Sequence, residues 1–187
     1  MKLRILLVAA ALVVPVIGLA PAQAVTGPGC YVNGVFVSGT AIDGTAGNDV
    51  IDCSKSTERV FVEGLGGGDR ILGSNFDDLL AGDSPFGQHP SDGNDVIAGN
   101  GGDDTLLGQG GNDRLDGGAG DDDLHGGPGS DNLAGGTGSD VLITGGTVQG
   151  GDGSRDLVDC GPGPDTVIFT PTQDLQVNCE SLNPEIP

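Results

Sequence analysis

Hydrophobic positions recur through the middle of the chain with a period of nine residues. An aliphatic residue stands at every ninth position from Ile97 to Leu142, an aspartate precedes it by two, and a glycine precedes that aspartate by two. The stretch 117–125 shows the whole unit, G-G-x-G-x-D-x-U-x, where U is aliphatic. The pattern predicts a six-residue turn followed by a three-residue strand in each unit. The aspartates of this regular run are Asp95, Asp104, Asp113, Asp122, Asp131 and Asp140.

Successive units are expected to stack into a parallel β-structure in which two units complete one coil. The aliphatic residue of each unit then points inward and packs on its equivalents in neighbouring coils, while the glycines permit tight turns. Aspartates 18 residues apart would share an edge, in the series Asp95–Asp113–Asp131 and Asp104–Asp122–Asp140. We therefore predict an all-β fold that carries two rows of carboxylates.

The repeat continues in damaged form on both sides of the regular run. Phe76 stands where a glycine belongs, which puts that turn in question, and the segment 83–91 breaks the register by one residue. Asp156 follows a degenerate turn that is also one residue out of step. The weaker candidates at the aspartate position are Asp49, Asp69, Asp78 and Asp165.

Stacked carboxylates repel one another unless a cation neutralises their charge. Two unit charges ~5 Å apart repel by about 3 kcal/mol at an effective dielectric constant of 20. A hard divalent ion removes this repulsion and takes about six to eight oxygen ligands, here carboxylates and the carbonyls of the turns. Ca²⁺ is favoured over Mg²⁺ because these ligands are numerous, flexible and all oxygen. Binding and folding should then be one event.

The N-terminal stretch has the organisation of a secretory signal peptide. A basic start at Met1–Arg4 precedes an apolar run, Ile5–Ala20, and small residues at Ala22 and Ala24 complete a cleavage site. An uncleaved membrane anchor is the alternative, but the run is short and the cleavage site follows it directly. We expect residues 1–24 to be removed, the chain to be secreted, and no later segment to cross a membrane.

Charge narrows the choice of partners. Without Lys2 and Arg4, five basic residues oppose 27 acidic ones, giving a formal charge of −22. Such a chain repels nucleic acid and anionic lipid and attracts cations. The 37 glycines and few aromatic residues would also suit a disordered chain, so that only the order of the residues indicates a fold.

Four cysteines follow the predicted cleavage site, which indicates two disulfides in an oxidising compartment. Three connectivities are possible. Because one pair precedes the repeats and the other follows them, we favour Cys30–Cys53 and Cys160–Cys179. A zinc site is the alternative, but neither CxxC spacing nor nearby histidines support it. The β-rich segments around both pairs are expected to cap the exposed strand edges.

Residues 44–52 and 64–168 resemble the haemolysin-type (RTX) calcium-binding repeat family. The segments around Cys160 and Cys179 are similar to the closing part of secreted actinobacterial calcium-binding repeat proteins. RTX toxins leave the cell through a dedicated exporter, whereas this chain begins with an ordinary signal peptide, so toxin biology is not transferred. The resemblance implies a right-handed parallel β-roll, or β-solenoid, and about four Ca²⁺ ions held between turns. Their aspartate pairs would be Asp95 with Asp113, Asp104 with Asp122, Asp113 with Asp131, and Asp122 with Asp140.

These observations predict a signal peptide over 1–24, an N-terminal cap with one isolated repeat over 25–63, a calcium-binding roll over 64–168 and a C-terminal cap over 169–187. The regular core of the roll is 93–143. The predicted function is calcium binding by a secreted roll that folds on binding extracellular Ca²⁺. The alternative is a structural or adhesive cell-surface protein that uses Ca²⁺ only for stability.

No catalytic residue or organic cofactor is expected, and we predict that the protein is not an enzyme. The motifs HExxH, GxSxG and the P-loop are absent. The two histidines, His89 and His125, fit a loop and a solvated strand position. Adjacent acids such as Asp121 and Asp122 could imitate a glycosidase pair, but a glycosidase cleft needs aromatic platforms that this chain lacks. An ice-binding roll would need regular threonine ladders, and Thr105 stands largely alone.

Overall fold

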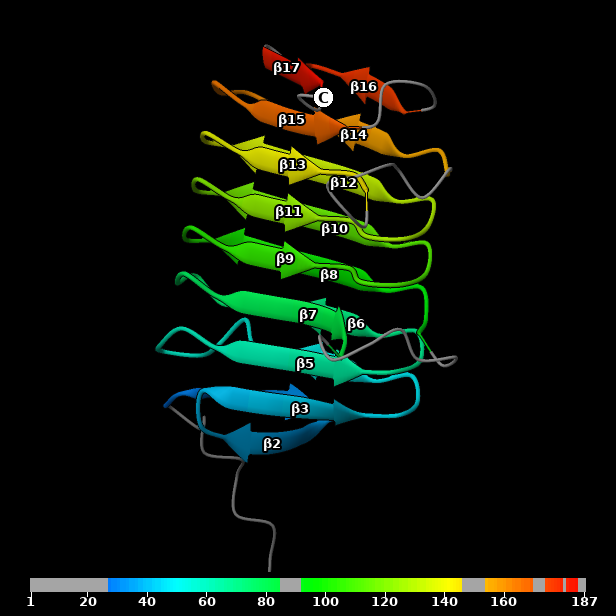
Figure 1. The fold of residues 1–187 in the computed structure, drawn as a ribbon. Coiled ribbons are helices and arrows are strands. Elements are labelled where there is room, and N and C mark those ends of the chain that lie inside the picture. The colour runs from blue at the N-terminus through cyan, green and yellow to red at the C-terminus, as the bar shows by residue number, and fades with distance from the viewer. Residues whose placement is uncertain (1–26, 85–91, 146–153, 170–173, 180, 185–187) are drawn as a thin grey trace, which may run out of the picture.

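Each repeat forms one short strand around its inward aliphatic residue, and consecutive strands alternate between two sheets (Figure 1). The computed structural model describes residues 27–84, 92–145, 154–169, 174–179 and 181–184. Over these residues all regular structure is β-strand, which confirms the predicted all-β roll. None of them forms a helix long and apolar enough to span a membrane. The predicted signal peptide and His89 lie outside the described residues.

The first sheet has the order β16-β14-β12-β10-β8-β6-β4-β1-β2 and the second has the order β17-β15-β13-β11-β9-β7-β5-β3. The strands of the first are β1 (Gly29–Val32), β2 (Val35–Ser38), β4 (Val50–Asp52), β6 (Arg70–Leu72), β8 (Val96–Gly101), β10 (Arg114–Ala119), β12 (Asn132–Thr137), β14 (Leu157–Asp159) and β16 (Leu175–Val177). Those of the second are β3 (Ala41–Thr45), β5 (Phe61–Leu65), β7 (Leu79–Asp83), β9 (Thr105–Leu107), β11 (Asp123–His125), β13 (Val141–Ile143), β15 (Thr166–Phe169) and β17 (Ser181–Pro184).

Two repeats complete one coil, as the spacing predicted. Leu115 in β10 pairs in parallel with Leu133, 18 residues later, and Leu106 in β9 pairs in the same way with Leu124. All of these leucines are fully buried. The core between the two sheets is a narrow stack of aliphatic side chains, one from each of the strands β3 to β15, and the coils hold together by burying it.

The interruptions do not break the stack. Ile71 in β6 pairs with Ile97 in β8, a step of 26 residues in place of 18, and Leu133 in β12 pairs with Val158 in β14, a step of 25. The first interruption therefore inserts eight residues and the second seven. After each insertion the chain returns to the sheet in the same register. The inward residue still packs on the inward residue of the previous coil, whatever the length of the loop between them.

The two ends of the roll are built differently. At the N-terminal end, β1 pairs antiparallel with both β2 and β4, so this hairpin covers the first sheet. Parallel pairing in the second sheet begins with β3 against β5. At the C-terminal end the parallel stack runs on to β16 and β17. Two disulfides, Cys30–Cys53 and Cys160–Cys179, lie near these ends, with the pairing that the cysteine positions favoured.

Candidate metal centres

The aspartates line the two edges of the roll where strands meet turns. On each edge the backbone N–H of one aspartate donates to Oδ1 of the aspartate one coil further on; between Asp95 and Asp113 this bond is 2.8 Å long. The first edge contains Asp49, Asp69, Asp95, Asp113, Asp131, Asp156 and Asp174. The second edge contains Asp78, Asp104, Asp122, Asp140 and Asp165. The predicted division of the aspartates between two edges is confirmed.

The second carboxylate oxygen has a different environment. For seven of these aspartates, Oδ2 is buried and receives no hydrogen bond: Asp69, Asp95, Asp104, Asp113, Asp122, Asp140 and Asp165. A buried carboxylate oxygen without a partner is costly, and in proteins it is normally satisfied by a hydrogen bond or a cation. The roll therefore repeats one unsatisfied acceptor from coil to coil on both edges.

We number the repeat from its first glycine, so that the aspartate stands at position 6. In the regular run, the glycine at position 1 faces Oδ2 of this aspartate. A Cβ added at Gly108 would lie 2.5 Å from Asp113 Oδ2 and 2.6 Å from the carbonyl oxygen of Gly126 in the next coil. At Gly135 the corresponding distances are 2.5 Å to Asp140 Oδ2 and 2.6 Å to the Cys160 carbonyl oxygen. These two glycines lack positive φ, so the turn needs them for the space that a side chain would occupy. A carboxylate and a carbonyl oxygen of the next coil border this space.

The oxygen-only donor set fits a hard divalent cation. No group of three or more His, Cys, Asp and Glu side chains among the described residues is gathered closely enough to hold a metal ion without further ligands. A Ca²⁺ ion would therefore be held by aspartates of successive coils together with backbone carbonyls, an all-oxygen set of the type that Ca²⁺ prefers. When bound, the ion supplies the positive charge that the stacked carboxylates lack.

Burial raises the pKa of several carboxyl groups in both rows. Desolvation is the largest cause for Asp113, whose pKa rises to about 8 with further contributions from the charges of Asp131 and Asp95. The same cause raises the pKa of Asp104 to about 7 and that of Asp122 to about 6. The charged form of each row is therefore disfavoured without a cation, and a bound ion would compete with protons for the same oxygens.

The first aspartate of each edge is already satisfied by the chain. Asp78 accepts hydrogen bonds from the Ser74 N–H at 2.6 Å, the Ser74 hydroxyl at 3.0 Å and the Val60 N–H at 2.8 Å. Asp49 accepts from the N–H and hydroxyl of Thr45 and from Asn33. Burial alone would raise the pKa of Asp49, but the hydrogen bonds from Asn33 and Thr45 outweigh it and hold that pKa below its usual value.

Side chains replace the inward glycine near the ends of the rows. Cys53 and Cys160 occupy position 1 at the two ends of the second edge, and both are fully buried and disulfide-bonded. On the first edge, Thr144 occupies this position, and its hydroxyl donates to Asp174 Oδ2 at 2.8 Å. At the starts of the rows the position-1 glycines Gly44 and Gly73 remain, and Thr45 and Ser74 satisfy the aspartates of those turns.

Sequence reasoning missed three aspartates: Asp83, Asp156 and Asp174. Asp156 accepts a 2.8 Å hydrogen bond from the Asp131 N–H, and its own N–H donates to Asp174 at 3.2 Å. The degenerate turn before Asp156 hid its place in the row, because the register was counted without allowing for seven inserted residues. Asp83 stands in the turn of Asp95 and is only 1% exposed. A search that tolerates insertions within turns would have found Asp156.

A second ladder of hydrogen bonds follows the outer side of the turns. The side-chain oxygen of the residue before the aspartate accepts from the backbone N–H one coil later, as in Asn112 N–H to Asn94 Oδ1 and Ser139 N–H to Asp121 Oδ1, both at 2.8 Å. These bonds run opposite to those of the buried row. Asn or Asp at this position thus ties each turn to the next without the help of an ion.

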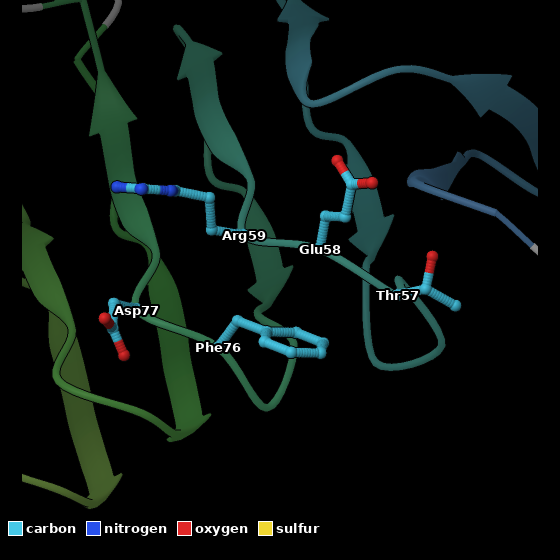
Figure 2. A pocket seen from close by; sticks show the side chains of 5 residues that line it. All are labelled: Thr57, Glu58, Arg59, Phe76 and Asp77. Atoms are coloured by element: carbon cyan, nitrogen blue, oxygen red, sulfur yellow. The ribbon is translucent and has the colours of Figure 1, made fainter.

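Other residues singled out in the sequence lie apart from the rows. His125 forms a 2.9 Å pair with Asp123, and both side chains are largely exposed. The turn at Phe76 keeps its place, since the Asp78 N–H donates to Asp104 at 2.8 Å. Phe76, with Thr57, Glu58, Arg59 and Asp77, lines an open hollow of about 350 Å³. Figure 2 shows that the charged side chains around this hollow do not converge on one point.

Comparison with known proteins agrees with this geometry. The family model of the RTX calcium-binding nonapeptide repeat (4 copies) matches residues 41–52, 89–124 and 125–146. The chain therefore carries RTX calcium-binding repeats in these segments, which supports Ca²⁺ binding by its β-roll. No curated protein and no solved structure gave a match.

Proposed function

We propose that this chain is a secreted protein whose roll folds when it binds extracellular Ca²⁺, and that it is not an enzyme. One observation supports folding on binding above all others: the buried Oδ2 atoms that receive no hydrogen bond recur from coil to coil. In the absence of a cation, each charged carboxylate in such a row opposes folding, whereas a bound ion turns the same groups into ligands.

The ions would sit between aspartates of successive coils on one edge. The four pairs within the regular run are Asp95 with Asp113, Asp104 with Asp122, Asp113 with Asp131, and Asp122 with Asp140. Asp69 and Asp165 extend the two rows with further unsatisfied oxygens. Asp49 and Asp78 serve instead as the hydrogen-bonded starts of the rows.

Secretion is supported by the N-terminal pattern and by the two disulfides, which are stable in oxidising compartments. Intracellular Ca²⁺ is scarce, so the chain would stay unfolded until export and fold outside. Mass spectrometry of protein recovered from the culture medium should find Val25 as its first residue. Retention of residues 1–24 would contradict cleavage at Ala24.

Circular dichroism of residues 25–187 tests folding on binding. In EDTA we expect the spectrum of an unfolded chain, and millimolar Ca²⁺ should produce the β signal, whereas Mg²⁺ at the same concentration should not. A full β signal in EDTA would refute folding on binding. Isothermal titration calorimetry measures binding separately, and a protein that releases or absorbs no heat with Ca²⁺ and gains no thermal stability would refute calcium binding itself.

A further inference from the structure

Asp83 occupies an unusual place in the roll. It is the last residue of β7, at position 2 of the turn that leads to Asp95, and the eight inserted residues follow it. The side chain is 1% exposed, yet neither carboxylate oxygen receives a hydrogen bond of normal geometry. The turn of Asp95 therefore contains two buried carboxylates with unsatisfied oxygens, both oxygens of Asp83 and Oδ2 of Asp95, whereas the regular turns contain one.

The residues at position 2 of other turns show how unusual this is. Leu65, Asn100 and Gln109 adopt positive φ there, at 84°, 75° and 74°, as do the glycines of the later turns. Thr45 and Ser74 lack positive φ, and each donates its N–H and its hydroxyl to the aspartate four residues later. Asp83 also lacks positive φ. It offers a carboxylate where Thr45 and Ser74 offer hydroxyl donors.

The two carboxyl groups of this turn interact electrostatically. A Cβ added at Gly82, the residue before Asp83, would overlap Asp95 Oδ2 and would lie 2.9 Å from the carbonyl oxygen of Gly108. Burial raises the pKa of Asp83 to about 7, and the nearby charges of Asp95 and Asp92 add to the effect, which the N–H of Gly93 partly offsets. The turn thus combines unsatisfied oxygens of Asp83 and Asp95 with a carbonyl oxygen that borders the space at Gly82.

We propose that Asp83 adds a second carboxylate from the same turn to the Ca²⁺ site of Asp95, at the base of the insertion, and that this site binds more tightly than the regular sites and fills first. Ca²⁺ affinity rises with the number of charged ligands, and this turn supplies one more than its neighbours. The inference rests on the proposed function, since it assigns the highest affinity among the calcium sites of the roll.

Isothermal titration calorimetry with CaCl₂ tests the assignment on residues 25–187. The unsubstituted protein should show a tight class of site ahead of the weaker ones. Asp83→Asn should weaken the tight class by about tenfold or more because one charged ligand is lost. Asp83→Ser, which copies the arrangement at Ser74, should abolish it by supplying Asp95 with a hydroxyl donor. Asp116→Asn, on the outer face of β10, removes the same charge away from the turns and should change no site by more than about twofold.

The outcomes separate the two proposals. If the tight class survives in both Asp83 variants, the assignment of Asp83 is wrong while calcium binding by the roll stands. If the unsubstituted protein shows no calcium binding, the proposed function fails first. Circular dichroism at saturating Ca²⁺ checks that the variants fold. If Asp83→Asn does not fold, Asp83→Ser decides, because a serine with the same role already occurs at position 74.

Discussion

At the scale of single residues, the inward glycine and the aspartate five residues later act as a pair. The glycine leaves the space and the aspartate places an oxygen in it, as Gly117 and Asp122 do. Near the ends of the rows Thr144 or a disulfide-bonded cysteine fills the same place. In the first turns the glycine remains and Thr45 or Ser74 satisfies the aspartate. The chemistry of each turn thus depends on the side chains at its first two positions.

We expect Ca²⁺ binding on the second edge to require the empty space at Gly117. A Cβ there would overlap Asp122 Oδ2 and would lie 2.5 Å from the Gly135 carbonyl oxygen, so Gly117→Ala should weaken Ca²⁺ binding on the second edge by about tenfold. Gly101→Ala is the control, because its Cβ would meet only the Ala119 carbonyl oxygen at 3.5 Å. Calcium titration by circular dichroism should give equal midpoints for Gly101→Ala and the unsubstituted protein. Equal midpoints for both variants would refute the role of the space.

Two aspartates with similar burial should respond in opposite ways to loss of charge. Asp113→Asn removes an unsatisfied charge, so it should raise the β signal in EDTA above that of the unsubstituted protein while weakening Ca²⁺ binding by about tenfold or more. Asp78→Asn breaks hydrogen bonds from Ser74, so it should destabilise the Ca²⁺-bound protein by about 1–3 kcal/mol and add no β signal in EDTA. Circular dichroism in EDTA and urea unfolding in Ca²⁺ measure the two effects. If the two variants change stability and Ca²⁺ binding in the same direction, the hydrogen-bonded and the unsatisfied aspartates are equivalent.

At the scale of the element, each edge is a row of coupled carboxyl groups. Every member donates its backbone N–H to the next and faces a neighbour of the same charge. Protonation or an ion at one aspartate therefore changes the field at the next. The edge, more than the single turn, is the unit that titrates.

The raised pKa values of these rows predict a pH dependence in the absence of Ca²⁺. A carboxyl group whose pKa is higher in the folded protein binds more protons when folded, so its contribution to stability is lost as the pH rises through that folded pKa. For Asp113 this loss spans the interval from about 4 to about 8. In EDTA, the fraction of folded protein should rise as the pH falls from 8 to 5. Ca²⁺ affinity should fall over the same interval because protons compete for the ligands.

Circular dichroism in EDTA at several pH values measures the folded fraction, and calcium titrations at the same pH values measure the affinity. Asp113→Asn should reduce the dependence of the EDTA signal on pH. A signal in EDTA that is independent of pH between 5 and 8 would contradict the shifted carboxyl groups.

At the scale of the whole molecule, the roll is a stack in which each coil contacts only its neighbours, and its ends are its weakest part. The hairpin of β1 and β2 covers one end, and a disulfide crosslinks the chain near each end. Cys53 and Cys160 stand at the inward position of the outer turns, so the crosslinks hold the coils that lack an open cation space.

Removal of a disulfide should therefore destabilise the protein without removing calcium sites. The Cys160–Cys179 bond closes a loop of 19 residues in sequence separation, for which chain entropy predicts about 3 kcal/mol. The double variant Cys160→Ser with Cys179→Ser should lose stability of this order in urea unfolding at saturating Ca²⁺, with an unchanged number of ions in calorimetry. A loss of bound ions would show that the bond also shapes the sites.

The sequence by itself determined the strands, the inward residues and the division of the aspartates between two edges. All of these follow from a nine-residue period, which places every second repeat on the same edge wherever the roll lies in space. It also led to the cysteine pairing, because one pair stands on each side of the repeats.

Tertiary structure alone decided which aspartates remain available for a cation. Asp49 matches the repeat as well as Asp69 does, and Asp78 departs from it at Phe76. Both are satisfied by contacts with Asn33, Val60 and residues within their own turns, whereas Asp69 keeps an unsatisfied oxygen. The place of Asp156 and the burial of Asp83 depend on how the inserted residues are accommodated. The physical reason is that hydrogen bonding and desolvation are set by neighbours one coil away, at sequence distances that insertions change.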